Sequence, residues 1–221
     1  TRAVKGEINK SSFYFPLSLK MFSLVSEGPF EEAIQGLVAQ EYPKLHTLDI
    51  FIKGVNVVSV GQKNMLGKAV SKMKGLKYFS INVPNYGEFF IQKSLFEGLI
   101  QTQIDFLNID LANLVPSCFL ILLSIKDLIQ WIAQFVVLKK LHIGLPLLHL
   151  CAEVSSGFAS LSRVEELAIK YKRVDCPHLG YISKAEESIP TIFDNIRRLA
   201  KLKTVIFKSE QQELPQMDFV R

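Results

Sequence analysis

The sequence contains few cysteines, and their spacing matches no common disulfide or metal pattern. Cys118, Cys151 and Cys176 are an odd number and stand 33 and 25 residues apart. A secreted disulfide framework uses an even set of cysteines, and a structural zinc site uses pairs separated by only a few residues. We therefore expect reduced cysteines, an intracellular protein, no metal and no cofactor.

Charge and long apolar runs are also scarce. Only 21% of the residues are charged and 48% are hydrophobic, a composition that excludes extended disorder. The 26 lysines and arginines exceed the 21 acids by five, and no block of like charges indicates a nucleic-acid tail. The most apolar stretch, residues 114–137, is interrupted by Pro116, Lys126 and Asp127. It predicts a buried helix and not a membrane span, so we expect no membrane partner.

One segment of the sequence matches a nucleotide-binding motif only in part. Residues 61–68 follow a β-rich run and resemble a phosphate-binding loop, yet five residues separate Gly61 from Gly67 where the motif has four. Ala69 also stands where the motif has its magnesium-binding hydroxyl. We interpret the segment as the start of a helix.

Catalytic constellations are missing as well. Asp175-Cys176-Pro177-His178 brings a thiol and an imidazole into one loop, but catalytic dyads are normally assembled from residues distant in sequence. The acidic pairs Glu165-Glu166 and Glu186-Glu187 are adjacent, so their side chains diverge and make no acid/base couple. Trp131 lies on an apolar helix and is interpreted as core. We predict that the protein is not an enzyme.

The sequence does contain a repeated apolar skeleton. Its unit is an apolar residue, two variable residues, an apolar residue, one variable residue and an apolar residue, as in Leu138 to Ile143. The last three residues of the unit alternate apolar, variable and apolar, which is the pattern of a half-buried strand. The seven copies occupy residues 19–24, 45–50, 76–81, 104–109, 138–143, 164–169 and 202–207.

Helical periodicity fills the intervals between these copies. The central apolar residues of successive copies, from Phe22 to Val205, stand between 26 and 38 residues apart, which leaves room for one helix each. Helices are predicted at 30–40, 62–73, 89–101, within 114–137, at 147–158 and at 186–200. The sequence therefore predicts an α/β protein in which strands and helices alternate.

The repeat resembles the leucine-rich repeat superfamily, in the divergent ribonuclease-inhibitor-like type found in F-box proteins. That resemblance implies a horseshoe of about seven irregular repeats with parallel strands on the concave face and helices on the convex face. Residues 1–16 would form an arm or cap, 17–209 the repeat domain and 210–221 a tail. The family's Asn or Cys ladder is replaced here by Lys53, Pro84, Ala112, Pro146, Lys172 and Glu210. The alternative fold is an open α/β domain with a parallel sheet.

Pleat alternation predicts which side chains line the concave face. The predicted contact residues are Thr47, Asp49, Phe51, Tyr78, Ser80, Asn82, Phe106, Asn108, Asp110, Lys140, His142, Lys170 and Lys208, and Met21, Ser23, Glu166 and Thr204 share the same face. Aromatic and acidic residues gather in the first half of the chain and basic residues in the second. We therefore expect a bipolar surface.

These features predict a non-enzymatic protein interaction module that belongs to a multi-protein complex. The resemblance implies a substrate-recognition part of an F-box-type ubiquitin ligase receptor, or an assembly scaffold. An F-box would precede the repeats, and residues 1–16 are too short to be one. A second hypothesis is an RNA or ribonucleoprotein scaffold that binds through the basic concave residues. A third hypothesis is a regulator of nucleotide hydrolysis, but no feature of the sequence identifies an arginine for that role.

Overall fold

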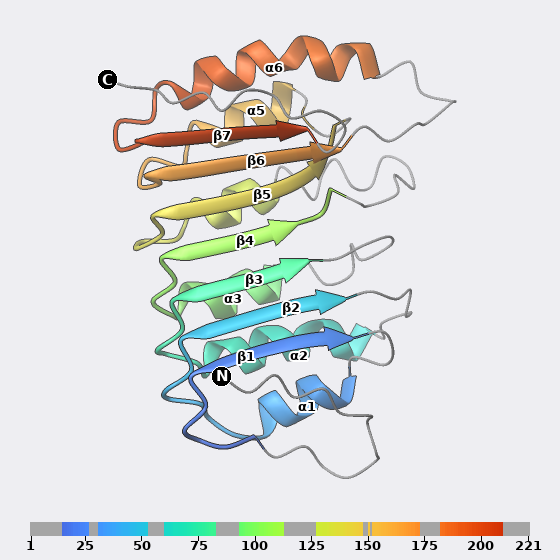
Figure 1. Ribbon diagram of the computed structural model, residues 1–221, viewed down its shortest axis with the longest axis vertical. Helices are drawn as coiled ribbons and strands as arrows, with labels where there is room; N and C mark the ends of the chain where they lie inside the picture. Colours follow the sequence, from blue (N-terminus) through green and yellow to red (C-terminus); the bar gives the residue numbers. More distant parts are fainter. Residues whose placement is uncertain are drawn as a thin grey trace.

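Seven parallel strands in sequence order form the sheet of the protein. The computed structural model describes residues 15–26, 31–52, 60–82, 93–112, 127–147, 150, 152–172 and 182–209. Within them the strand order is β1-β2-β3-β4-β5-β6-β7, and every pairing is parallel (Figure 1). The strands are β1 Met21–Ser26, β2 Thr47–Ile52, β3 Tyr78–Asn82, β4 Phe106–Asp110, β5 Lys140–Pro146, β6 Glu166–Lys172 and β7 Thr204–Ser209. All seven predicted strands are confirmed.

The apolar skeleton sets the register of this sheet. Its central residue occupies the same position in every strand, so each central residue lies opposite the next. These residues are Phe22, Leu48, Phe79, Leu107, Leu141, Leu167 and Val205. A slip by one residue would turn each of these apolar side chains to the other face, so core burial holds the register.

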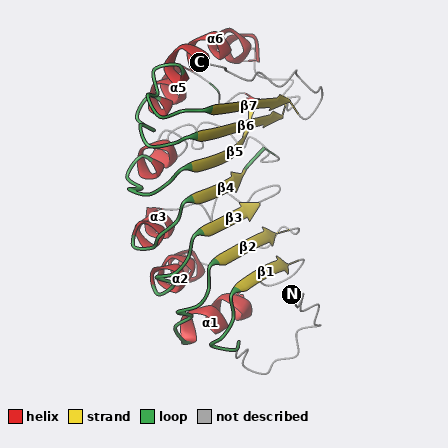
Figure 2. Cartoon of the chain, turned by 60° about the vertical axis from the view of Figure 1, so that its left-hand side comes forward, coloured by secondary structure: helices red, strands yellow, loops and turns green. Residues whose placement is uncertain are grey.

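All described helices lie on one side of the sheet (Figures 1 and 2). They are α1 Glu31–Ala39, α2 Val60–Ser71, α3 Lys93–Ile100, α5 Ala152–Phe158 and α6 Ile182–Ile196, and residues 127–132 are also helical. A doubly wound sheet would have helices on both faces and a rearranged strand order. The described chain has neither property, and it forms a solenoid-like α/β fold with one open sheet face.

A further apolar residue, three positions before the skeleton, completes the core at the turn into five of the seven strands. Tyr42, Met73, Phe135, Leu161 and Leu199 occupy this position and are buried. In four turns the carbonyl oxygen of this residue accepts a hydrogen bond from the first skeleton residue, as in Leu76 N to Met73 O at 2.9 Å. The sequence prediction missed this position, although the apolar spacing of three continues through it.

The carbonyl group of the residue just before each strand makes the first hydrogen bonds to the next strand. The carbonyl oxygen of Lys20 accepts N–H groups from both His46 and Thr47, at 2.8 and 3.2 Å. The same double contact recurs at every strand junction up to Glu165, whose carbonyl accepts from Lys203 and Thr204. The residues just before the strands are thereby stacked along one edge of the sheet.

The described part of the apolar segment 114–137 packs into the core. Leu128, Ile129 and Ile132 are buried, and the Trp131 ring lies 5.3 Å from the Phe96 ring. Trp131 is partly buried and packs against the core, so the prediction of a core tryptophan is confirmed in part. No described helix is long and apolar enough to cross a bilayer.

Phe15 covers the first strand. Its ring lies 4.6 Å from that of Phe22, and its carbonyl oxygen accepts a hydrogen bond from Gln40. The neighbouring Tyr42 hydroxyl donates to the carbonyl of Gly36 at 2.9 Å, and burial raises the pKa of this phenol. The rest of the predicted arm, residues 1–14, and the predicted tail, 210–221, lie outside the described residues.

Candidate partner-binding face

The sheet face away from the helices, here called the open face, carries three rows of side chains. Strand alternation turns these residues away from the buried skeleton, and the register aligns them across the strands. The first row is Met21, Thr47, Tyr78, Phe106, Lys140, Glu166 and Thr204, the second is Ser23, Asp49, Ser80, Asn108, His142, Ala168 and Ile206, and the third is Val25, Phe51, Asn82, Asp110, Gly144, Lys170 and Lys208. By this register, all thirteen predicted contact residues lie on this face.

Three rings form a run across the middle of the open face. The Tyr78 and Phe106 rings meet edge to face with centroids 4.7 Å apart, and the Phe106 and His142 rings meet likewise at 4.7 Å. Edge-to-face contacts between rings at this distance are favourable. Phe51, which the sequence grouped with the two aromatics, lies in the third row, four residues or about 13 Å along the strand. It is not part of the run.

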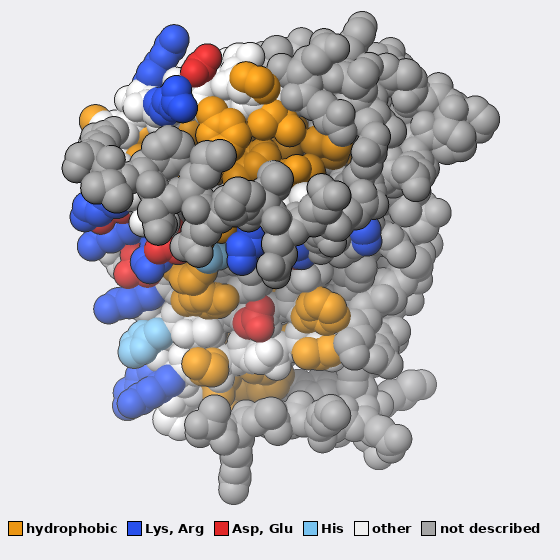
Figure 3. Space-filling view, turned by 45° about the horizontal axis from the view of Figure 1, so that its top comes forward, with side chains coloured by type: hydrophobic (Ala, Val, Ile, Leu, Met, Phe, Trp, Pro, Cys, Tyr) orange, Lys and Arg blue, Asp and Glu red, His pale blue; other side chains and the backbone are white. Residues whose placement is uncertain are grey.

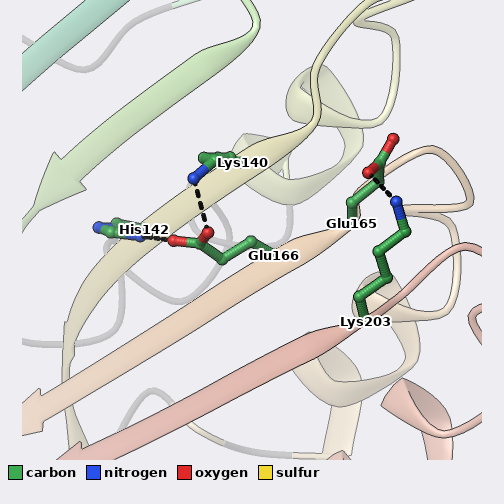
Figure 4. Close-up of polar contacts among 5 residues, drawn as sticks. All are labelled: Lys140, His142, Glu165, Glu166 and Lys203. Atoms are coloured by element: carbon green, nitrogen blue, oxygen red, sulfur yellow. Dashed lines mark hydrogen bonds and ion pairs between the residues drawn. The ribbon is translucent and has the colours of Figure 1, made fainter. Parts of the chain in front are cut away.

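Glu166 contacts the two basic side chains at one end of this run. Its carboxylate accepts from Lys140 Nζ at 2.8 Å and contacts His142 Nε2 at 2.9 Å (Figure 4). The hydrogen bonds from Lys140 and His142 hold the pKa of the Glu166 carboxyl below its usual range, and the same contact raises the pKa of Lys140. We call Tyr78, Phe106, Lys140, His142 and Glu166 the central cluster.

The neighbouring Glu165 points elsewhere. Its carboxylate accepts from Lys203 Nζ at 2.6 Å, and this hydrogen bond lowers the pKa of the Glu165 carboxyl. Figure 4 shows the two glutamates directed at different lysines. The sequence prediction that this pair diverges is therefore confirmed.

The shifted pKa of Glu166 predicts how stability depends on pH. A carboxyl group whose pKa is lowered by folding stabilises the protein above the unfolded value, near pH 4.5, and loses that contribution as the pH falls through the folded value. In urea unfolding, Glu166→Gln should be less stable than the wild type at neutral pH, and the difference should shrink below about pH 4.5.

Glu97→Gln is the matched control for this measurement. Glu97 pairs with Lys93 on an exposed helix surface, where an ion pair contributes little. Its stability difference from the wild type should stay near zero across the same pH range. A Glu166→Gln difference that grew toward low pH would contradict the assignment.

A second network crosses the third row at Asp110. This carboxylate accepts from Lys170 Nζ at 3.0 Å, from Asn82 Nδ2 at 3.3 Å and from the Ala112 backbone N–H at 3.0 Å. Lys170 stands two strands away, and it reaches Asp110 over Gly144 on the strand between them. The missing side chain of Gly144 provides the space for this ion pair.

These contacts correct the prediction of a bipolar face. Lys140 and Lys170, two of the basic residues assigned to the second half, are paired with acids, and Asp110 joins the two halves. Ser80 and Asp110 are only 4% and 9% exposed, so they position their neighbours instead of presenting groups to a partner. The Ser80 hydroxyl accepts a hydrogen bond from the amide of Asn108 at 3.1 Å.

Glu166 and Gly144 were not among the residues predicted to bind a partner. A signal for Glu166 existed, because aligning the skeletons places it opposite Lys140 on the next strand. Gly144 had a weaker signal, because a glycine inside a strand often marks a close approach of other groups.

Some of the other sequence motifs lie within the described residues and some lie outside them. The motif-like residues 61–68 lie within α2 and form no loop, as the helix interpretation predicted. The described residues contain no group of three or more metal-binding side chains. The three cysteines and the segment 175–178 lie outside the described residues. Of the six positions where the family ladder would stand, the structure describes Ala112 and Pro146, both buried, and Lys172.

Sequence comparisons do not extend this description. No protein-family model matches the chain, and no curated protein matches it.

Proposed function

We propose that the protein is a leucine-rich repeat solenoid that binds another protein through its open face and has no catalytic activity. The observation that carries the proposal is the run Tyr78, Phe106 and His142, half-buried on a sheet face that the described helices leave uncovered. Aromatic residues with polar neighbours are typical of the centre of protein interfaces.

The solenoid geometry supports a concave binding surface. Adjacent strands lie about 4.8 Å apart, whereas packed helices need about 8–10 Å between their axes. A layer of helices joined one-to-one to a layer of strands therefore bends with the strands inside. A partner seated on the strands would meet several repeats at once.

The side chains of the central cluster contact one another without a partner. Phe106 is held between the Tyr78 and His142 rings, and Glu166 fixes both His142 and Lys140. Side chains that are already fixed lose less conformational entropy on binding. The cluster offers apolar edges at one end and a satisfied ion pair at the other. We expect it to suit an apolar side chain flanked by hydrogen-bonding groups.

The leucine-rich repeat resemblance supplies the biological setting of the proposal. It implies substrate recognition within an F-box-type ubiquitin ligase receptor, or a scaffold role in another assembly. RNA binding through the open face is less favoured. Lys140 and Lys170 already contact carboxylates, and a phosphate would have to displace those contacts.

The experiment is affinity capture of partners with the double variant Tyr78→Ala/Phe106→Ala. Removing two interface rings should weaken capture of a true open-face partner by at least about tenfold. Quantitative mass spectrometry against the wild type measures the loss, and thermal unfolding verifies that the variant is folded.

Leu17→Ala/Val136→Ala is the matched control, because it truncates two exposed apolar side chains away from the open face. It should leave capture of the same partners unchanged. Equal capture by the wild type and the open-face variant would refute the proposal.

A further inference from the structure

The edge of the sheet where the strands begin is strongly basic. We call it the turn edge and define it as residues 15–20, 40–46, 72–77, 101–105, 133–139, 159–165 and 197–203. It has eleven basic residues and three acids, which leaves +8, whereas the whole chain has +5 and the remainder therefore −3. The basic residues are Lys20, Lys44, Lys72, Lys74, Lys77, Lys139, Arg163, Arg197, Arg198, Lys201 and Lys203, and the acids are Glu41, Asp105 and Glu165. All the basic ones except Lys72 are exposed.

Two lysines and a histidine are stacked in the first half of this edge. The carbonyl contacts between strands place Lys20, His46 and Lys77 in consecutive positions, about 4.8 Å apart. Among the described residues, no acid forms an ion pair with any of the three. Figure 3 shows basic side chains along the left-hand edge, where the strands start.

The second half of the edge has a different arrangement. There Glu165 stands between Lys139 and Lys203 in the same stack, bonds Lys203, and has its pKa lowered by both. Asp105 likewise stands between Lys77 and Lys139 in the stack. Both halves nevertheless stay positive, with +3 in the four segments up to residue 105 and +5 in the three segments after it. The whole edge is therefore suited to an anion supplied from outside.

Exposed apolar side chains share this edge. Leu17, Val136 and Val137 are 59%, 67% and 39% exposed, and they make up three of the five large hydrophobic side chains exposed in the described chain. Lysines surrounding protruding aliphatic side chains are the pattern of a protein surface that rests on a bilayer. No exposed aromatic on the turn edge offers a base a surface on which to stack.

We propose that the turn edge docks on the surface of an anionic lipid bilayer, with the lysines at the phosphate level and the turn residues Val136 and Val137 entering the interface. The edge spans six strand intervals, or about 29 Å, in one line. Such contact needs no membrane-spanning helix. It also leaves the open face free, so it is independent of the proposed protein partner. The sequence analysis predicted no membrane partner, because the residues of the turn edge come together only in the fold.

The test is co-sedimentation of the intact protein with vesicles. The wild type should bind phosphatidylcholine vesicles that contain phosphatidylserine and should not bind phosphatidylcholine alone. Lys20→Glu/Lys77→Glu should weaken binding at least about tenfold, because each lysine near an anionic surface contributes roughly fivefold in affinity. Lys93→Glu/Lys208→Glu, with the same charge change away from the turn edge, should bind nearly as the wild type does.

A second variant separates lipid from other polyanions. Val136→Ser/Val137→Ser should weaken vesicle binding without affecting retention on heparin. Three results would overturn the proposal: equal loss in both charge variants, no difference between the two vesicle types, or binding to polyuridylate or polyglutamate without binding to vesicles. Thermal unfolding of each variant verifies its fold, and loss of vesicle binding with partner capture intact leaves the proposed function standing.

Discussion

Replacing Gly98 with valine is expected to destabilise the protein by about 4 kcal/mol, a large share of a domain's typical total stability. Gly98 is buried in α3 where this helix crosses α2. A Cβ at this position would overlap the carbonyl oxygen of Gly67 and stand 3.1 Å from its carbonyl carbon. Because both atoms belong to backbone, no side-chain rotation relieves the overlap. The helices would have to separate.

The reciprocal glycine has the same role. A Cβ on Gly67 would overlap the Ser94 carbonyl oxygen and stand 2.7 Å from its carbon. Neither glycine has a positive φ, so close helix packing and not backbone strain demands glycine at both positions. Solenoid helices must follow strands that are only about 4.8 Å apart, and two glycines let neighbouring helix axes approach.

A double-mutant cycle tests this explanation by urea unfolding. Gly67→Ala and Gly98→Ala should each cost about 2 kcal/mol, net of the gain in helix propensity. Together they should cost less than the sum, because the first change already separates the helices. Gly157→Ala is the control. Its Cβ would meet only the Ile129 side chain, at 3.0 Å, which can rotate away. Full additivity would contradict the shared-contact explanation.

Much of the fold could be predicted from the sequence because one physical constraint repeats. Each strand buries alternate residues, and the spacing of the skeleton therefore identified the seven strands and their register. The ends of the helices were harder to predict. Helix α6 starts at Ile182, four residues before the prediction, and Pro190 lies inside it. Apolar periodicity locates the buried face of a helix better than its first turn, where few residues are buried.

For the candidate face, the positions of the residues could be predicted, but only some of their contacts could. The positions of its residues follow from pleat alternation, so all thirteen lie in the three rows of the open face. Their interactions depend on which side chains meet across strands. The Lys140–Glu166 pair joins register neighbours and was predictable in principle. The Lys170–Asp110 pair spans two strands, and no rule about adjacent positions predicts it.

Gly144→Ala is expected to cost about 3 kcal/mol by breaking this second pair. The added Cβ would overlap Asp110 Oδ1 and stand 3.0 Å from Cγ, so the carboxylate would have to turn away. It would then lose its bonds to Lys170, Asn82 and the Ala112 N–H, although Asp110 is only 9% exposed. A charged group that is left buried without partners is costly.

Most of this effect should disappear when Asp110 is absent. In an Asp110→Ala background no carboxylate occupies the space beside Gly144, and the added Cβ meets only the backbone Cα of residue 110 at 3.2 Å. The cost of that contact is offset by the lower entropic penalty of alanine in a strand, so Gly144→Ala should then change the stability by less than about 1 kcal/mol. Urea unfolding of the four proteins in the cycle measures both values. If Gly144→Ala were equally destabilising with and without Asp110, the glycine would be required by something other than the ion pair. Loss of the destabilisation without Asp110 would establish that Gly144 is present in β5 so that Asp110 and Lys170 can meet across it.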